Sequence, residues 1–287
     1  MVDDSIRVRL IGGLGNQIFQ YFGGLYAANL LEKSLIVDTR WLDGEHSHRF
    51  SDIRNFKFFS PERVITSETN GKIFLPFERI KNKLVLEISI LSKLFLINHP
   101  KNPGYFDFTG MSTGVELRGY YQSYSYFENI EAKSGKLSWE LTNFSGEYLK
   151  LLTVLKEEPF IAVHVRGGDY RQKRNIYHEL ATDYYSLAIS ELIKKKNITK
   201  VIVFTNDLHY ARELFRGFKF IFQDQSGLNA SESMILMAMA EGIVIANSTF
   251  SYWSAVINGT NEIIAPSLWY KNRKIEKDFY PKNWSII

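Results

Sequence analysis

The order of apolar and polar positions predicts a βαβ unit at the start of the chain. Ile6 to Ile11 have an apolar strand pattern, and Gly12 to Gly15 follow as a turn. Gln17 to Leu31 then show helical periodicity, and apolar residues from Leu35 to Val37 begin a second strand. A strand, glycine turn, helix and strand within so few residues favour a parallel sheet.

The second half of the chain repeats this alternation of short apolar strands and helices. The strands are expected at Phe160 to Val165, Val201 to Phe204, Ile221 to Phe222 and Ile243 to Ala246, and the helices at Asp183 to Lys196 and Glu232 to Ala240. Between the two halves, residues 50–65 and 101–119 show no clear period, and the linker is expected within residues 135–159.

Two such arrays predict an α/β fold of two Rossmann-like domains facing a cleft, one spanning residues 1–150 and the other residues 151–287. The pattern leaves open whether the last residues pack back on the first domain. In open parallel sheets, ligands bind beyond the carboxyl ends of the strands. The residues that carry the chemistry are therefore expected just after strands.

Composition narrows the class of protein. The 35 Lys and Arg residues exceed the 31 Asp and Glu residues by only 4, too weak an excess to indicate a nucleic-acid partner. The chain has no cysteine, which excludes disulfides and thiolate metal sites. Two acids and two arginines near the N-terminus stand where an export signal needs an apolar run, which predicts a cytoplasmic protein.

One segment leaves a peripheral contact with the inner membrane open. The most apolar stretch, Leu84 to Ile97, is too short to span a bilayer and contains Glu87 and Lys93. The longer segment from Glu78 to Lys101 combines lysines with an apolar face that could lie on an anionic membrane surface. A core-packing helix with solvated lysines is the favoured interpretation.

The glycine turn brings backbone N–H groups to the start of a helix. Gly12, Gly13 and Gly15 lie between the first strand and the first helix, so the backbone can approach an anion at the positive end of the helix dipole. The alternative is that these glycines only make a tight strand-to-helix turn.

Asp38 supports a rival hypothesis, an NAD(P)-dependent oxidoreductase. It ends the second strand, about where a dinucleotide-binding fold places its ribose-binding acid. The glycine spacing of that fingerprint fails at Ile18, where a third glycine is expected. Asn16 and Gln17 also add amides that the fingerprint does not require, so this rival is the weaker hypothesis.

A basic segment follows the central strand of the second half. His164 and Arg166 alternate onto one face at the carboxyl end of that strand. Arg166 offers a planar fork of donors that matches phosphate oxygens. Gly167 and Gly168 would let the backbone approach the same ligand, and Asp169 is a candidate to orient Arg166 or to accept a proton. The alternative is a surface loop with a weak Arg166–Asp169 ion pair.

Three segments together resemble the α-1,2-fucosyltransferases of glycosyltransferase family 11. They are Gly12 to Gln17 (Gly-Gly-Leu-Gly-Asn-Gln), His164 to Tyr170 (His-Val-Arg-Gly-Gly-Asp-Tyr) and Ala246 to Trp253 (Ala-Asn-Ser-Thr-Phe-Ser-Tyr-Trp). Gly119 to Ser123 (Gly-Tyr-Tyr-Gln-Ser) is a weaker fourth segment. Each segment is modest alone, and their order and separation make the resemblance specific.

The resemblance implies a GT-B-like pair of domains, an N-terminal one on the acceptor side and a C-terminal one that binds a GDP-sugar, with inverting, metal-free transfer. Expected donor contacts are Gly13, Gly15, His164, Arg166, Glu232, Asn247, Ser248, Thr249 and Ser251. Expected catalytic residues are Arg166 on the pyrophosphate, Asn16 near the reacting centre and Asp169 as a possible base. No Asp-x-Asp triplet is present to bind a metal.

Two departures from the family pattern concern the donor site. Gly167 stands where a second arginine usually follows the first, and Arg171 or Arg174 are candidates to replace that charge. Ser233 stands near the position of a carboxylate that is plausible as a guanine reader, and the neighbouring Glu232 is the expected substitute.

The expected function is transfer of fucose from GDP-β-L-fucose to the 2-hydroxyl of a terminal galactose. The acceptor would be an oligosaccharide, a lipid-linked oligosaccharide or a surface polysaccharide unit such as O-antigen. GDP-colitose or another GDP-deoxyhexose remains an alternative donor. A catalytically weak protein that binds sugar nucleotides or glycans is a further alternative, because the second arginine is missing.

Overall fold

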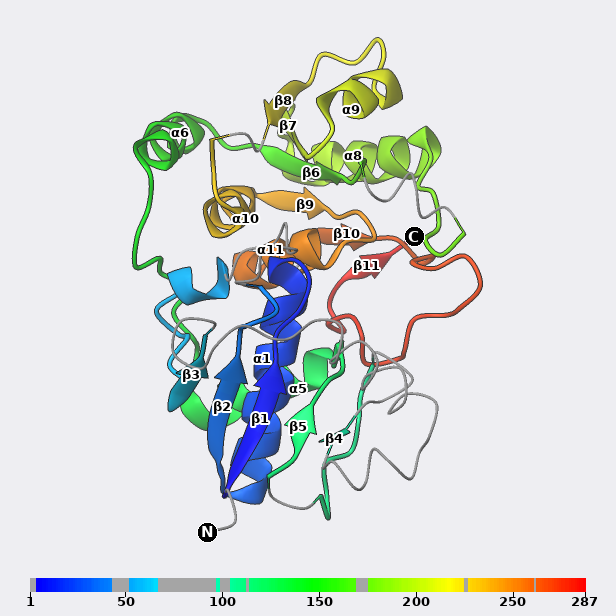
Figure 1. The fold of residues 1–287 in the computed structure, drawn as a ribbon. Coiled ribbons are helices and arrows are strands. Elements are labelled where there is room, and N and C mark those ends of the chain that lie inside the picture. Colours follow the sequence, from blue (N-terminus) through cyan, green and yellow to red (C-terminus); the bar gives the residue numbers. More distant parts are fainter. Residues whose placement is uncertain are drawn as a thin grey trace. The chain divides into compact units, whose positions relative to one another are not determined.

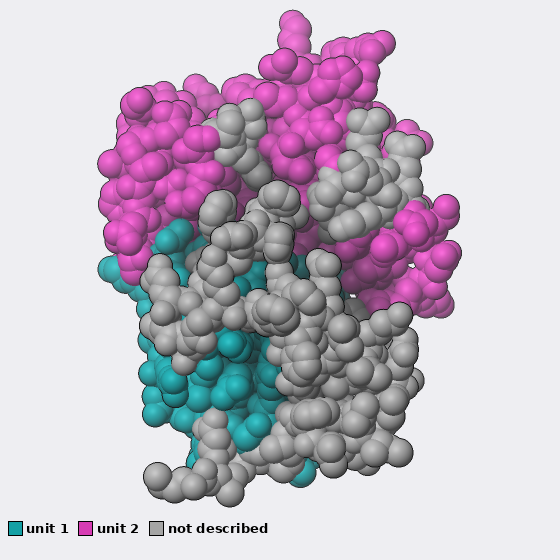
Figure 2. All heavy atoms as spheres, viewed as in Figure 1, with its two compact units in different colours: residues 1–138, 276–280 teal, residues 139–275, 281–287 magenta. Residues whose placement is uncertain are grey.

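The computed structural model describes residues 4–42, 52–66, 104–111, 114–168, 175–224, 227–260 and 262–287, together with the backbone of residues 97–98. The chain divides into two compact units (Figure 2). Unit 1 comprises Met1–Ser138 and Glu276–Tyr280, and unit 2 comprises Trp139–Ile275 and Pro281–Ile287. Each unit is built around its own sheet.

Unit 1 is a parallel sheet with the strand order β3-β2-β1-β5-β4 (Figure 1). Its elements are β1 (Ser5–Arg9), α1 (Leu14–Leu31), β2 (Ser34–Asp38), the 3-10 helix η1 (Asp52–Asn55), β3 (Arg63–Ile65), β4 (Ile97–Asn98), β5 (Glu116–Leu117) and α5 (Tyr124–Ser134). The predicted βαβ unit is confirmed, with α1 beginning three residues before the expected Gln17. The short strands β3, β4 and β5 were not predicted.

Close packing holds α1 against the sheet of unit 1. Ile6 and Val8 of β1 are fully buried, and α1 passes so close to them that one helix position has no room for a side chain. A Cβ at Gly24 would lie 2.9 Å from the Cβ of Val8 and 3.2 Å from Cδ1 of Leu35. Gly24 therefore permits the helix to lie directly on β1 and β2.

Unit 2 is a second parallel sheet with the strand order β11-β10-β9-β6-β7-β8 (Figure 1). Its elements are α6 (Gly146–Glu157), β6 (Ile161–Val165), α8 (Thr182–Lys196), β7 (Val201–Thr205), α9 (Leu208–Leu214), β8 (Ile221–Asp224), α10 (Ala230–Ala238), β9 (Gly242–Val244), α11 (Thr249–Asn258), β10 (Ile263–Ala265) and β11 (Ser285–Ile286). Every residue of β6 and β7 is buried, as expected for strands covered on both faces.

The predicted strands and helices of the second half are present, whereas the second half of the expected linker contains a helix. Residues 146–157 form α6, which begins at a hydrogen bond from the Tyr148 N–H to Oγ of Ser145. Because α6 packs against α10, it belongs to unit 2. The division accordingly falls between Ser138 and Trp139 instead of at the expected residue 150, and Glu276–Tyr280 returns to unit 1.

In the described part of the chain, no helix has the length and apolar character needed to cross a bilayer. The segment from Glu78 to Lys101, in which we expect either a membrane contact or a core helix, lies outside the described residues apart from the backbone of 97–98.

The packing of α1 predicts that Gly24→Ala destabilises the protein. Alanine favours a helix over glycine by up to about 1 kcal/mol, but crowding Val8 typically costs 1–3 kcal/mol, so we expect a net loss of stability. Urea unfolding measures this loss. Gly146→Ala is the control, because Gly146 opens α6 with no heavy atom within 4 Å of its added Cβ. Equal stability of the two variants would contradict the packing argument.

Candidate active site

The functional residues of unit 2 follow strands that are neighbours in its sheet. β9, β6 and β7 lie side by side and parallel, so their carboxyl ends reach the same edge. Arg166 follows β6, Asp207 follows β7, and Ser248 follows β9. The expected position just after strands is therefore the observed one for these residues.

His164 links the end of β6 to the start of α11. The His164 side chain is 1% exposed. The centroid of its ring lies 5.4 Å from that of Phe250, which belongs to the first turn of α11. Burial, assisted by the positive charge of Arg166, lowers the pKa of His164 to about 3, so the imidazole is neutral at working pH. Its Nδ1 atom is buried without a hydrogen-bond partner among the described residues. The ring thus packs against α11 two residues before Arg166, without adding charge.

Two side chains after β7 hold the loop that carries Arg166. Oδ1 of Asn206 accepts a hydrogen bond from the Gly167 N–H at 3.1 Å, and Oδ2 of Asp207 accepts one from the Gly168 N–H at 3.1 Å. The other carboxylate oxygen of Asp207 accepts from the Tyr210 N–H and caps α9. These two glycine N–H groups are therefore already used, and the expected approach of this backbone to the ligand stays a prediction.

The start of α11 offers a second feature suited to an anion. Ser248 is its N-cap, but no side-chain hydrogen bond caps the helix and no acid lies in its first turn. The aligned peptide dipoles give such a start roughly +0.5 elementary charge. Ser248 is buried and Thr249 is half-buried, and their hydroxyls lie at this end of the helix. A phosphate group fits this environment.

Two expected donor contacts are occupied by structural hydrogen bonds instead. Nδ2 of Asn247 donates to the carbonyls of His178 (2.7 Å) and Trp269 (3.0 Å) and so joins two loops. Oγ of Ser251 is fully buried and donates towards the carbonyls of Ala246 and Ser248. We therefore assign both side chains to the support of the α11 turn.

Glu232, the expected guanine reader, has both carboxylate oxygens bound to backbone N–H groups at two helix starts. One carboxylate oxygen accepts from the Asn229 N–H at 2.9 Å and completes a capping box at the start of α10. The other accepts from the Ser145 N–H at the start of α6. Its neighbour Ser233, which replaces the carboxylate of the family pattern, is buried with no partner for Oγ among the described residues.

Unit 1 presents the glycine turn. Gly12 has a φ of +79°, which favours glycine, and Gly13 is the N-cap of α1, while Gly15 is buried inside its first turn. Gln17 is fully buried and closes the turn by donating from Nε2 to the Gly12 carbonyl at 3.0 Å. The turn is thus fixed from inside, and its remaining amide, Asn16, lies nearer the surface.

Asn16 is held by a residue of the weaker fourth segment. Nε2 of Gln122 donates to Oδ1 of Asn16 at 3.1 Å, across 106 residues of sequence.

Asp38, the acid behind the oxidoreductase hypothesis, is fully buried and binds the Arg40 guanidinium through both carboxylate oxygens (3.0 and 2.7 Å). The structure therefore gives Asp38 an ion-pair role within unit 1.

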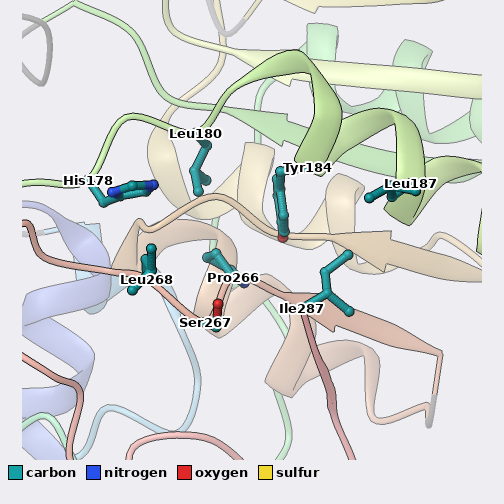
Figure 3. A pocket seen from close by; sticks show the side chains of 8 residues that line it. All are labelled: His178, Leu180, Tyr184, Leu187, Pro266, Ser267, Leu268 and Ile287. Carbon is teal, nitrogen blue, oxygen red and sulfur yellow. The ribbon is translucent and has the colours of Figure 1, made fainter.

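A shallow groove of about 210 Å³ lies elsewhere on unit 2 (Figure 3). Apolar side chains such as Leu187 and Leu268 dominate its lining, with His178 and Ser267 as polar members. Among the described residues, no Lys or Arg lines it, so this described lining does not suit a diphosphate. None of the predicted site residues that the structure describes belongs to this groove.

Asp169, Arg171 and Arg174 lie outside the described residues, so their expected roles stay predictions. Within the described ranges, no group of three or more His, Asp or Glu side chains is arranged to hold a metal ion. Metal-independent transfer likewise stays a prediction.

Asn206, Asp207 and Gln122 were not expected as site residues. In the sequence, Gln122 stands out only as part of the weaker fourth segment. The one usable signal was that Asn206 and Asp207 directly follow a buried strand, where loops gather at the functional edge of a parallel sheet.

Two parallel-sheet units with candidate residues at a carboxyl edge define the architecture of GT-B-like glycosyltransferases. The chain belongs to Glycosyl transferase family 11, whose sequence pattern matches residues 5–287. This membership confirms the resemblance and leaves the oxidoreductase hypothesis without support.

Three known proteins illustrate the similarity. The chain is 30% identical to an Alpha-1,2-colitosyltransferase of Escherichia coli, over 98% of each chain. It is 22% identical to the O-antigen biosynthesis glycosyltransferase WbnK of Escherichia coli, over 93% of this chain and 96% of that protein. A crystal structure of NodZ alpha-1,6-fucosyltransferase soaked with GDP-fucose matches the fold with a TM-score of 0.51 and 14% identity, over 88% of this chain and 92% of that one.

The buried, neutral state of His164 predicts a specific pH dependence of stability. Its pKa is lower in the folded than in the unfolded chain, so the unfolded chain takes up a proton first and stability falls as pH drops below 6.5 towards 3. We expect His164→Gln to remove about 1 kcal/mol of this loss per pH unit. Urea unfolding at pH 7, 6, 5 and 4 measures the difference.

His209→Gln is the control, since the side chain of His209 is 80% exposed on α9. It should follow the wild-type pH dependence. If wild type and His164→Gln lost stability in parallel, His164 would not be a buried neutral group.

Proposed function

We propose that this protein is an inverting glycosyltransferase that moves a deoxyhexose from a GDP-sugar to a sugar hydroxyl. The observation that carries the proposal is the packing of His164, two residues before Arg166, against Phe250 in the first turn of α11, which brings the end of β6 beside the start of α11 at the carboxyl edge of unit 2. A guanidinium and a helix start are two independent sources of positive potential, and a diphosphate is the sugar-nucleotide group that needs them.

Arg166 has the main role in the proposed chemistry. As the bond between the anomeric carbon and the diphosphate oxygen breaks, negative charge builds on the leaving GDP and positive charge on the sugar. A preorganised guanidinium stabilises that negative charge more strongly in the transition state than in the ground state. Ser248 and Thr249 add hydroxyl donors. Asn247, Ser251 and Glu232 support the site without touching the donor in this proposal.

The new glycosidic bond forms between the acceptor oxygen and the anomeric carbon, on the face opposite the leaving GDP, so a β-linked donor gives an α-linked product. The acceptor proton passes to a base, for which Asp169 is the candidate, or to the departing phosphate. Asn16 is proposed to donate a hydrogen bond near the reacting centre, with Gly13 and Gly15 shaping the backbone beside it. No metal is required in this scheme, because Arg166 and the α11 start supply the positive potential.

Fucose is the first candidate sugar, supported by the NodZ structure soaked with GDP-fucose. Colitose is the second, supported by the 30% identical colitosyltransferase, whose name also specifies the α-1,2 linkage that we propose here. Colitose lacks the 3-hydroxyl that fucose carries. The protein's choice between the two therefore reduces to whether its site hydrogen-bonds that hydroxyl.

The proposed acceptor is the 2-hydroxyl of a terminal galactose in an oligosaccharide or surface polysaccharide unit. The similarity to an O-antigen biosynthesis glycosyltransferase supports this choice. Such acceptors are carried on lipids, which fits a cytoplasmic enzyme with a peripheral contact at the inner membrane.

Replacing Arg166 tests the proposed role directly. We expect Arg166→Ala to lower kcat/KM for transfer by about 10²- to 10³-fold, because one preorganised charged donor is lost. The kcat/KM of Arg166→Lys should lie between those of the wild type and Arg166→Ala, since a point charge replaces a bidentate fork. Sugar transfer to a galactoside in the presence of EDTA measures kcat/KM of both variants. Arg216→Ala is the control, because Arg216 is an exposed arginine beyond α9. A folded Arg166→Ala protein with wild-type turnover would refute the role.

A comparison of GDP-fucose with GDP-colitose identifies the sugar. A site that hydrogen-bonds the 3-hydroxyl should prefer fucose by about 10⁴-fold or more, because colitose leaves buried polar groups unpaired. A site that lacks this contact should use both donors within about 10²-fold. Competition between the two donors with the product linkage determined by NMR decides the case. No transfer from either donor would contradict the proposal.

A further inference from the structure

The weaker fourth segment of the resemblance, Gly119 to Ser123, has no role in the function proposed so far. Its Gln122 nevertheless reaches Asn16, with Nε2 lying 3.1 Å from Oδ1 of Asn16. Gln122 is only 6% exposed, so its side chain is buried rather than free in solvent. A buried amide aimed at a predicted catalytic amide suggests a positioning function.

The backbone on both sides of Gln122 is fixed. Tyr121 is fully buried with a φ of +50°, a conformation that bulky residues rarely adopt. It can lie there because α1 has a glycine opposite it: a Cβ at Gly23 would be 2.7 Å from the Cβ of Tyr121. The strained residue is thus locked between α1 and Phe108, whose ring centroid is 5.6 Å from that of Tyr121.

The residue after Gln122 is held by the segment Glu276–Tyr280 that returns to unit 1. Oγ of Ser123 donates to the Asp278 carboxylate, and the Tyr124 N–H donates to the Asp278 carbonyl at 2.9 Å. Phe279 adds a stacked contact with Phe19 of α1 at 6.1 Å. Gln122 therefore projects from a turn that is anchored before and after it, which leaves its amide little freedom.

The orientation of the Asn16 amide follows from this contact. Since Oδ1 accepts from Gln122, the N–H groups of Nδ2 are the ones left for another partner. Nδ2 lies beside the glycine turn, 3.0 Å from where a Cβ at Gly12 would be. Without a fixed donor at Gln122, the Asn16 amide could turn round and present an acceptor there instead.

We infer that Gln122 is a positioning residue, which turns Asn16 so that its amide presents donors, not an acceptor, to the sugar-nucleotide. This inference rests on the proposed function for the identity of the ligand. The Gln122–Asn16 contact itself is independent of that function and can be tested separately.

Gln122→Glu is the sharpest variant because it keeps the size of the side chain and replaces the amide donors with a carboxylate, which also adds a negative charge. A carboxylate can only accept, so Asn16 must turn its Nδ2 inward and present Oδ1 to the ligand. We expect kcat to fall by about tenfold or more with the donor KM changed by less than about threefold, the pattern of an interaction made in the transition state. Asn16→Asp keeps the bond to Gln122 but loses the donor, and should lose kcat to a similar extent.

Tyr126→Phe is the matched control. Its hydroxyl donates to the Phe106 carbonyl at 3.0 Å and accepts from the Phe106 N–H at 2.6 Å, so the variant loses two hydrogen bonds in α5, the helix that follows Gln122, without touching Asn16. It should lose stability and keep kcat. A wild-type kcat in Gln122→Glu, or an equal fall in Tyr126→Phe, would overturn the inference.

Urea unfolding of Asn16→Ala, Gln122→Ala and the double variant tests the contact without any substrate. If the two side chains are partners, the loss of stability in the double variant should be smaller than the sum of the two single losses. Strictly additive losses would overturn the inference. If wild type transferred no GDP-sugar but the losses were non-additive, the proposed function would fail while the Gln122–Asn16 pair would stand.

Discussion

The loop that carries Arg166 depends on hydrogen bonds from two glycine N–H groups to Asn206 and Asp207. A guanidinium on a loose loop would have to be ordered by its ligand at a cost in free energy. Here the loop is tied to the neighbouring strand before any ligand binds. A Cβ at Gly167 would lie 2.5 Å from the Cβ of Asp207, so the glycine that replaces the usual second arginine is also what permits this close approach.

The two units use the same device with different residues. In unit 1, Gln17 closes the glycine turn from inside, and Asn16 remains at its surface. In unit 2, Asn247 and Ser251 fix the turn before α11, and Thr249 remains at its surface. In each case a buried polar side chain satisfies backbone groups that would otherwise be costly to bury. Of two neighbouring polar residues in one motif, one can therefore stabilise the turn while the other remains at its surface.

Much of the fold could be predicted from the sequence because long, buried elements leave a strong pattern. The βαβ start, β6, β7 and α8 were predicted within a few residues. Two-residue strands such as β5 carry no period of their own and depend on pairing with β1. The helix α6 was mistaken for a linker, although the Ser145 cap and the acid in its first turn were readable signals.

The site was predictable at the level of motifs and less so at the level of single side chains. The spacing of His164 and Arg166 on a strand fixes their common face, so their positions followed from sequence alone. The role of Glu232 could not be predicted from the sequence, because its carboxylate binds the start of α6, 87 residues away in the chain. The local half of that role, an Asn229-x-x-Glu232 capping box, could have been recognised. Gln122 shows the same limit, since its partner Asn16 lies 106 residues away.

Titration calorimetry of the wild-type protein with GDP, GMP and guanosine in EDTA tests the central claim most directly. The account holds that Arg166 and the start of α11 recognise a diphosphate, so it predicts that GDP binds at least about tenfold more tightly than GMP and GMP more tightly than guanosine, since each charge-assisted hydrogen bond contributes about 1.5–3 kcal/mol. Equal affinities for the three compounds would contradict it.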